Sequence, residues 1–183
     1  MKTSLRRRAS LGLVVGVLSL LSQSPATAHD HRAPRTSLRA DAQKQPGYVV
    51  ERTWVRRAGP TICVANNVLF PLRFPGDRVK IPAGQAPVIR LEKSQFPHDL
   101  SVTAWRRVRE GKPRGAPQTL PFTLVPLIAR DGRISAWDVQ LQPLVEERSY
   151  FLMLEAHWSD ENGCGSPVGA DQALWTTYSL KVR

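Results

Sequence analysis

The sequence predicts an all-β protein built as an antiparallel β-sandwich, and three observations favour this fold class. Apolar side chains recur at every second position in short runs after Pro46, which is the period of strands with one buried face. Eleven prolines between Pro71 and Pro167 leave few windows for a long helix, because proline removes a backbone donor. Turn residues separate the runs at intervals typical of a sandwich.

The strands are expected where this alternation is clearest. The alternating runs span residues 68–74, 89–91, 100–104, 120–124, 137–141 and 178–182. Residues 144–162 lack proline and glycine and contain good helix formers, so a helix is an open alternative there. We predict a strand over residues 149–158 instead, because large apolar side chains alternate through Tyr150, Leu154 and Trp158.

The first 28 residues are expected to be a signal peptide. Three arginines precede an apolar run over residues 11–21 that is too short to cross a bilayer as a helix. Ala26-Thr27-Ala28 has the A-x-A pattern of a cleavage site, so the mature chain is expected to begin at His29. The protein is therefore expected to be secreted or extracytoplasmic, with no transmembrane anchor after cleavage. Both the general and the twin-arginine export routes are open.

The mature chain is expected to divide into an arm and one domain. Residues 29–46 are mostly charged or small, with Leu38 as the only large apolar side chain, and predict a flexible N-terminal arm. Residues 47–183 predict the β-sandwich domain, which is long enough for a single core. Loss of the leader lowers the lysines and arginines from 26 to 22 against 15 acids, so the mature charge is +7. A basic chain favours anionic partners.

The chain contains two cysteines, Cys63 and Cys164, and no C-x-x-C motif. In an exported protein the simplest interpretation is a structural disulfide that closes most of the domain. On the chain-entropy account, a bridge across so long a loop contributes up to about 4 to 5 kcal/mol.

One segment resembles fibronectin type III and immunoglobulin-like domains. Leu144, Tyr150, Leu154 and Ala156 follow the pattern L-x-x-x-x-x-Y-x-x-x-V-x-A, with leucine in the valine position. The resemblance implies a sandwich in which the tyrosine forms a tyrosine corner, and it implies no particular function. Cys164 does not lie two residues after the tyrosine, so the predicted disulfide differs from the inter-sheet bridge of immunoglobulins.

The candidate binding surface is a basic segment that includes an aromatic residue. Its residues are Trp105, Arg107, Arg109, Lys112 and Arg114. The first three alternate and are expected to share one strand face, turned away from the apolar positions of residues 100–104. An aromatic ring among cations suits sugars, phosphates or carboxylates. The alternative is a solvated strand whose charges prevent edge-to-edge aggregation.

The expected mature terminus, His29-Asp30-His31, is a candidate copper site. A free amine, backbone amides and a third-position imidazole together suit Cu(II) or Ni(II) in a square plane. Alternatively, the amine and ring of His29 could act with a distant histidine, such as His98 or His157. That arrangement resembles lytic polysaccharide monooxygenases and periplasmic copper carriers. The other interpretation of these residues is a polar spacer left after cleavage.

The sequence supports binding better than catalysis. It contains neither the G-x-S-x-G motif nor the H-E-x-x-H motif, and nothing else in it indicates an enzyme. We expect a non-catalytic module at the cell envelope that binds an anionic polymer or another envelope protein, with no cofactor and no nucleic acid partner. The alternative is a copper-binding or copper-dependent oxidative protein that uses His29.

The exported protein is expected to begin at His29 and to be lighter than its reduced form by two hydrogen atoms. Cys63→Ser is expected to lower the free energy of unfolding by roughly 2 to 5 kcal/mol, because it releases the constraint on the unfolded chain. Intact mass before and after reduction, followed by denaturant unfolding, checks both statements. Two titratable thiols in the native protein would contradict the disulfide.

Overall fold

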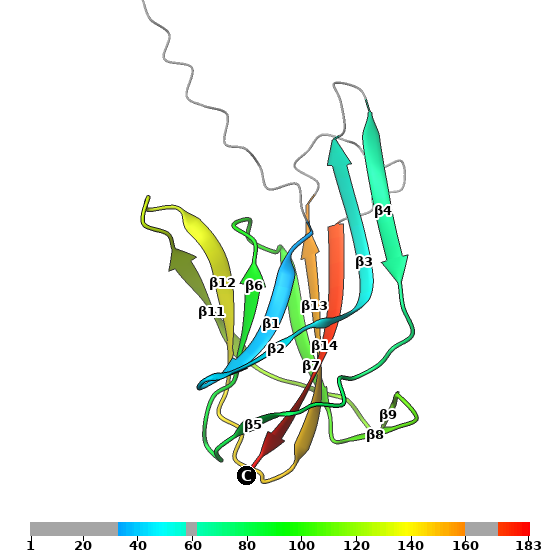
Figure 1. Cartoon of the computed structure of the whole chain (residues 1–183), viewed down its shortest axis with the longest axis vertical. Coiled ribbons are helices and arrows are strands. Elements are labelled where there is room, and N and C mark those ends of the chain that lie inside the picture. Colours follow the sequence, from blue (N-terminus) through cyan, green and yellow to red (C-terminus); the bar gives the residue numbers. More distant parts are fainter. Residues whose placement is uncertain (1–32, 58–61, 160–171) are drawn as a thin grey trace, which may run out of the picture.

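The computed structural model describes residues 33–57, 62–159 and 172–183, and these residues form strands and turns without any helix (Figure 1). The strands pair antiparallel, with one parallel exception between β5 and β14. The all-β, antiparallel fold class predicted from the alternation is therefore confirmed. None of the described segments is a helix long and apolar enough to span a membrane. The predicted signal peptide lies outside the described residues.

The smaller of the two main sheets has five strands. Their order across the sheet is β11 (Phe122–Ile128), β12 (Ile134–Leu141), β6 (Val88–Glu92), β1 (Arg35–Ala40) and β2 (Gln43–Pro46). Proline and a register shift disturb the outer strand β11, where Pro126 lies next to the irregularity at Leu127 and Ile128. Such features blunt an exposed sheet edge.

The larger sheet has seven strands. Their order is β10 (Gln118–Thr119), β7 (Asp99–Trp105), β13 (Ser149–Trp158), β14 (Gln172–Val182), β3 (Tyr48–Arg57) and β4 (Cys63–Leu69), with β5 (Val79–Ile81) beside β14. The long hairpin partners β13 and β14 form its centre, and β3 and β4 extend beyond the smaller sheet (Figure 1). A separate hairpin of β8 (Arg107–Arg109) and β9 (Lys112–Arg114) follows β7.

One apolar core lies between the two main sheets. The smaller sheet contributes Leu38, Ile89, Leu91 and Val139, and the larger contributes Val102, Leu152, Leu154, Leu174 and Leu180, all fully buried. Alternation supplies these side chains, because every second residue of a strand faces the same side. The result is a β-sandwich-like arrangement in which both inner faces are apolar.

Residues 35–46 form β1 and β2, so the prediction of a flexible arm is wrong for this segment. β1 pairs with β6 and with β2, and Leu38 is fully buried. The charge of the segment concealed a strand, because Arg35 and Arg39 project outward while Leu38 and Ala40 face the core. A single large apolar side chain, Leu38, is sufficient to anchor β1 in the core, since the side chains around it come from other strands.

The strand expected over residues 68–74 ends at Leu69. Pro71 and Pro75 break the pairing with β3, because proline cannot donate to the ladder. Phe74 instead packs edge-on against Phe151, with ring centroids 5.5 Å apart. The strand predicted from alternation is therefore wrong beyond Leu69, because alternation alone takes no account of the prolines.

The run expected at residues 120–124 is only partly a strand, because β11 begins at Phe122, after Leu120 and Pro121. The remaining expected strands are present. β6, β7 and β12 cover the alternating runs at residues 89–91, 100–104 and 137–141, and β13 spans Ser149–Trp158, where a helix was the alternative. Tyr150 lies near the start of β13 and is 7% exposed. Cys63 is the first residue of β4, but Cys164 lies outside the described residues, so the disulfide stays a prediction.

Leu38→Ala is expected to lower the free energy of unfolding by about 2 to 5 kcal/mol, because it removes a fully buried side chain and leaves a cavity. Arg39→Ala is the matched control on the next residue and should cost less than about 1 kcal/mol. Urea unfolding of both variants measures the difference. Equal stability of the Leu38 variant and the wild type would mean that β1 is not part of the folded core.

Candidate functional site

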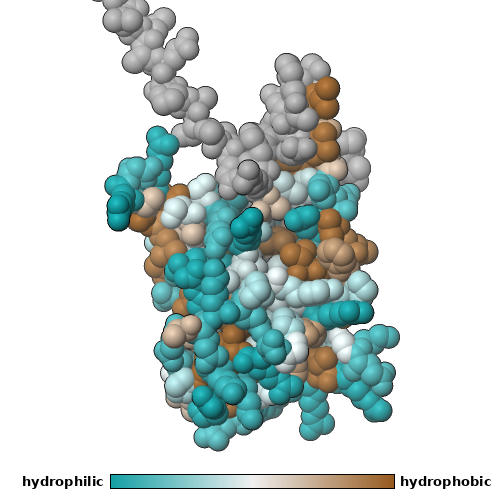
Figure 2. Space-filling model, viewed as in Figure 1, coloured by the Kyte–Doolittle hydropathy of each residue, from teal (hydrophilic) through white to brown (hydrophobic). Residues whose placement is uncertain are grey.

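The β8–β9 hairpin carries four cations of the candidate binding surface. Arg107 lies opposite Arg114 in the pairing, and Arg109 lies opposite Lys112. All four side chains are exposed. Gly111 closes the turn with a φ of 76°, a left-handed conformation that glycine adopts without strain. Figure 2 shows hydrophilic side chains projecting from this corner of the molecule, at the lower right.

Trp105 does not share a strand with these arginines, contrary to expectation. β7 ends at Trp105, a bend follows at Arg106, and β8 begins at Arg107. The indole is half-buried and packs against Phe74, with ring centroids 6.1 Å apart. The bend therefore separates the tryptophan from the strand that carries the arginines, and its half-buried ring packs on Phe74.

Arginines gather around a pocket of about 760 Å³ beside the hairpin. Its lining residues are Arg78, Arg106, Arg107, Val108, Arg109, Arg114, Ser149 and Phe151. Lys112 and Trp105 are not among them. No carboxylate lines this pocket within the described part of the chain, so five guanidinium groups face one space without an acidic neighbour in its wall.

Arg78 was not singled out by the sequence, because it lies far from the hairpin along the chain. Its guanidinium lies over the ring of Phe151 at 5.5 Å and donates a hydrogen bond of 3.0 Å to Ser149 Oγ. These contacts hold the side chain at the pocket wall.

Two described acids pair with arginines of this pocket without lining it. Arg106 pairs with Glu146 at 3.7 Å, and Arg109 pairs with Glu110 at 3.6 Å. Both pairs are exposed, so each contributes little and is easily exchanged for another anion. The local field therefore stays positive.

The positive charge extends beyond the pocket. A neighbouring depression shares Arg78 and is also lined by Lys80, Lys181 and Arg183, with Asp77 as its one acid among the described residues. We call the two depressions together the basic surface. It consists of Arg78, Lys80, Arg106, Arg107, Arg109, Arg114, Lys181 and Arg183.

The structure brings His98 and His157 together. Their ring centroids are 6.4 Å apart, because the start of β7 pairs with the end of β13. His98 Nδ1 also lies 3.4 Å from Ser159 Oγ. Within the residues described, no group of three or more histidine, cysteine, aspartate or glutamate side chains is positioned to hold a metal. The predicted copper residues His29 and His31 lie outside the described residues.

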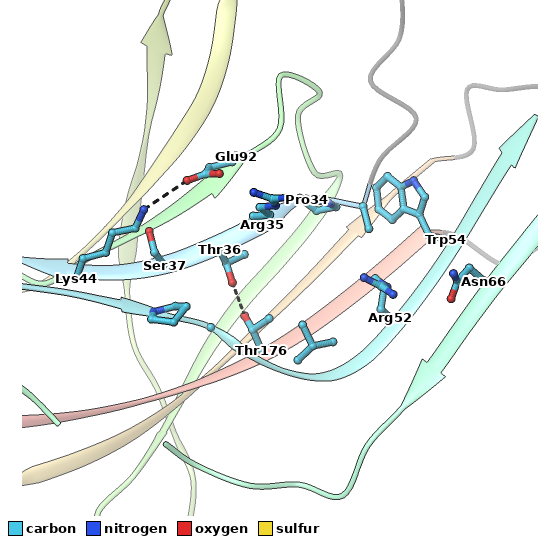
Figure 3. Close-up of a pocket in the computed structure, with 14 residues that line it drawn as sticks. Pro34, Arg35, Thr36, Ser37, Lys44, Arg52, Trp54, Asn66, Glu92 and Thr176 are labelled. Carbon is cyan, nitrogen blue, oxygen red and sulfur yellow. Dashed lines mark hydrogen bonds and ion pairs between the residues drawn. The ribbon is translucent and has the colours of Figure 1, made fainter. Parts of the chain in front are cut away.

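A second cavity, of about 560 Å³, opens between the two sheets where β3 turns away from β1 (Figure 3). Its polar wall includes Thr36 and Thr176, whose hydroxyls are 3.3 Å apart. Lys44 and Glu92 form an ion pair of 3.9 Å at its margin. Arg52, on β3, also lines it. We call this cavity the inter-sheet cleft.

A buried hydroxyl lies behind Thr176, which lines the inter-sheet cleft. Thr176 Oγ1 lies 3.1 Å from the hydroxyl of Tyr178, which is fully buried. Burial disfavours the phenolate and raises the pKa of Tyr178 well above its usual range, so the hydroxyl stays protonated. Gly47 belongs to the same packing, because an added Cβ would lie 2.9 Å from that hydroxyl. No sequence pattern indicated this cleft, since its lining residues come from six strands and the segments beside them.

Comparison with known proteins adds no relative: the chain matches no protein-family profile, no curated protein sequence and no solved structure.

Proposed function

We propose that this protein is an exported, non-catalytic binding module that holds an anionic polymer of the cell envelope on its basic surface. The observation that carries the proposal is the set of five arginines around one pocket with no carboxylate in its described wall. Guanidinium groups bind carboxylate and phosphate oxygens in a forked geometry, and several together suit a repeating anion.

The surroundings of the pocket support a polymer over a small ligand. The basic surface continues from the hairpin across Arg78 to Lys80, Lys181 and Arg183. A charged strip of this kind can contact several anionic units at once, and each added contact strengthens the whole interaction. The net charge of +7 expected for the mature chain, from 22 lysines and arginines against 15 acids, adds a long-range attraction to the same kind of partner.

The finer features of the proposal rest on the sequence. Export follows from the A-x-A pattern before His29, and the bridge between Cys63 and Cys164 suits an oxidising compartment. The spacing of Leu144 and Tyr150 supports a fibronectin type III or immunoglobulin-like sandwich. Domains of that kind commonly bind other molecules through the loops and faces of a rigid frame.

A second candidate function is copper binding, which the proximity of His98 and His157 favours. Imidazoles suit copper, and the predicted terminus at His29 adds an amine and further nitrogen ligands. In this proposal the metal is held at the terminus, alone or together with one of the paired histidines.

Arg107→Glu combined with Arg109→Glu is expected to weaken retention on a poly-γ-glutamate column and on envelope fractions by at least about tenfold near 50 mM salt. The reason is that two cations of the pocket become repulsive. The matched control is Arg130→Glu with Arg133→Glu, which makes the same charge change on the exposed turn between β11 and β12. Retention of the wild type should fall as salt rises, because small ions screen the attraction. Equal losses in both double variants, or no retention of the wild type at low salt, would refute a localised site.

Copper titration of the protein beginning at His29 tests the second function. If the terminus binds, one Cu(II) should be taken up per chain, and His31→Ala should weaken this uptake by at least about tenfold, because one of the ligands is lost. His98→Ala distinguishes the two modes, since only the shared site should respond to it. The visible absorption of Cu(II) reports both. No stoichiometric uptake by the wild type would end this candidate.

A further inference from the structure

The inter-sheet cleft contains an arginine that has no partner in the described structure. The Nε of Arg52 is buried and makes no hydrogen bond, and the guanidinium forms no ion pair with any described residue. The side chain as a whole is half-buried. A partly buried cation loses part of its hydration, and this loss is unfavourable until an anion pairs with it.

Another arginine of this chain shows the usual arrangement. Arg90 donates two hydrogen bonds to Asp138, of 2.7 and 2.8 Å, across the neighbouring strands β6 and β12. That hydrogen-bonded carboxylate raises the pKa of Arg90 and neutralises its charge. Arg52 has the same chemical group in a comparable position within the other sheet, but the carboxylate is missing.

The charges of the cleft leave room for one anion. Arg35, Lys44 and Arg52 are its cations, and Glu92, its one described acid, is already paired with Lys44. Arg35 is exposed at the mouth of the cleft, whereas Arg52 lies deeper (Figure 3). A single negative charge beside Arg52 would balance the half-buried guanidinium, whereas the exposed Arg35 is screened by water.

The other walls indicate the rest of the ligand. Figure 3 shows Asn66 on β4 beside Arg52 on β3, so an amide N–H can join the guanidinium in binding one carboxylate. Pro34, Val49 and Trp54 supply apolar walls. A cavity of about 560 Å³ has the size of a site for a small molecule, and this mixture of apolar walls with a few converging polar groups is typical of such sites.

We propose that the inter-sheet cleft binds a small monocarboxylate with an apolar portion, whose carboxylate is held by Arg52 and Asn66. Its apolar portion lies against Pro34, Val49 and Trp54. The site is separate from the basic surface, because the two share no lining residue. A free organic acid and the C-terminal residue of a short peptide both present this chemistry.

The test uses N-acetyl-L-leucine as the acid and N-acetyl-L-leucinamide as its uncharged counterpart, titrated calorimetrically into the full mature protein. The wild type is expected to bind the acid with a Kd of about 1 mM or tighter, which is the strength expected of so small a ligand. The amide should bind at least about tenfold more weakly, because it lacks the charge that pairs with Arg52. Acetyl-glycyl-leucine extends the test to the peptide source.

Two variants locate the binding. Arg52→Gln should weaken the acid at least about tenfold and leave the amide unchanged, and Arg52→Lys should give an intermediate loss because lysine keeps the charge without the fork. Arg133→Gln, in the exposed turn between β11 and β12, and the Arg107 and Arg109 double variant should both bind the acid as the wild type does. The double variant alters the basic surface but not the inter-sheet cleft, so its result shows whether acid binding depends on the proposed function.

Stability of the ligand-free protein gives a second readout. Arg52→Gln should unfold at the same temperature as the wild type or higher, because it removes a half-buried charge that has no partner. Equal binding of acid and amide, no binding by the wild type up to about ten times the expected Kd, or a lower unfolding temperature for Arg52→Gln would each overturn the proposal. Tighter binding of glycerol phosphate than of the acid would overturn the choice of a carboxylate.

Discussion

Burial of one apolar layer between two sheets is the constraint on which the rest of this structure depends. The central strands β13 and β14 supply Leu152, Leu154, Leu174 and Leu180, and each of these side chains is fully buried. Neighbouring side chains on the same face of the larger sheet cannot exclude water from them, so the smaller sheet must cover them. β1 is part of this covering sheet, and β2 is paired with it. Residues of both strands line the inter-sheet cleft, so the packing that closes the core also forms the wall of the cleft.

Arginine has three different roles in this one fold, and its surroundings decide which. Arg90 is paired within the sheet to Asp138, where two charge-assisted hydrogen bonds compensate for partial burial. The arginines of the basic surface are mostly exposed, so water screens them and they remain available to an external anion. Arg52 is half-buried and has no partner among the residues that the structure describes. Only this last arrangement leaves a partly buried guanidinium with no anion beside it among the described residues, so a ligand carboxylate would compensate for the lost hydration.

Strand positions were largely predictable, and the errors have physical causes. The alternation through Leu152, Leu154 and Ala156 overrode helix propensity correctly, because full burial of the face that carries them outweighs intrinsic preference. The same pattern failed at residues 70–74, where Pro71 interrupts pairing. Apolar alternation did not indicate β1, since a strand with one large apolar residue shows no visible period of two. Part of the candidate binding surface was found from its clustered arginines, whereas Arg78 was not, because only the packing on Phe151 brings it there.

The sequence by itself determined the period of the strands, the excess of positive charge and the concentration of arginines at the hairpin, because these depend on neighbours along the chain. Tertiary structure decided which of these residues act together. Arg52 and Asn66 lie on paired strands, but the cleft around them exists only because β1, from the other sheet, stands opposite. Whether a charge has a partner depends on distances between segments remote in sequence, and the pairing of strands fixes those distances. For that reason the paired Arg90 and the unpaired Arg52 look alike in the sequence and differ in the folded protein.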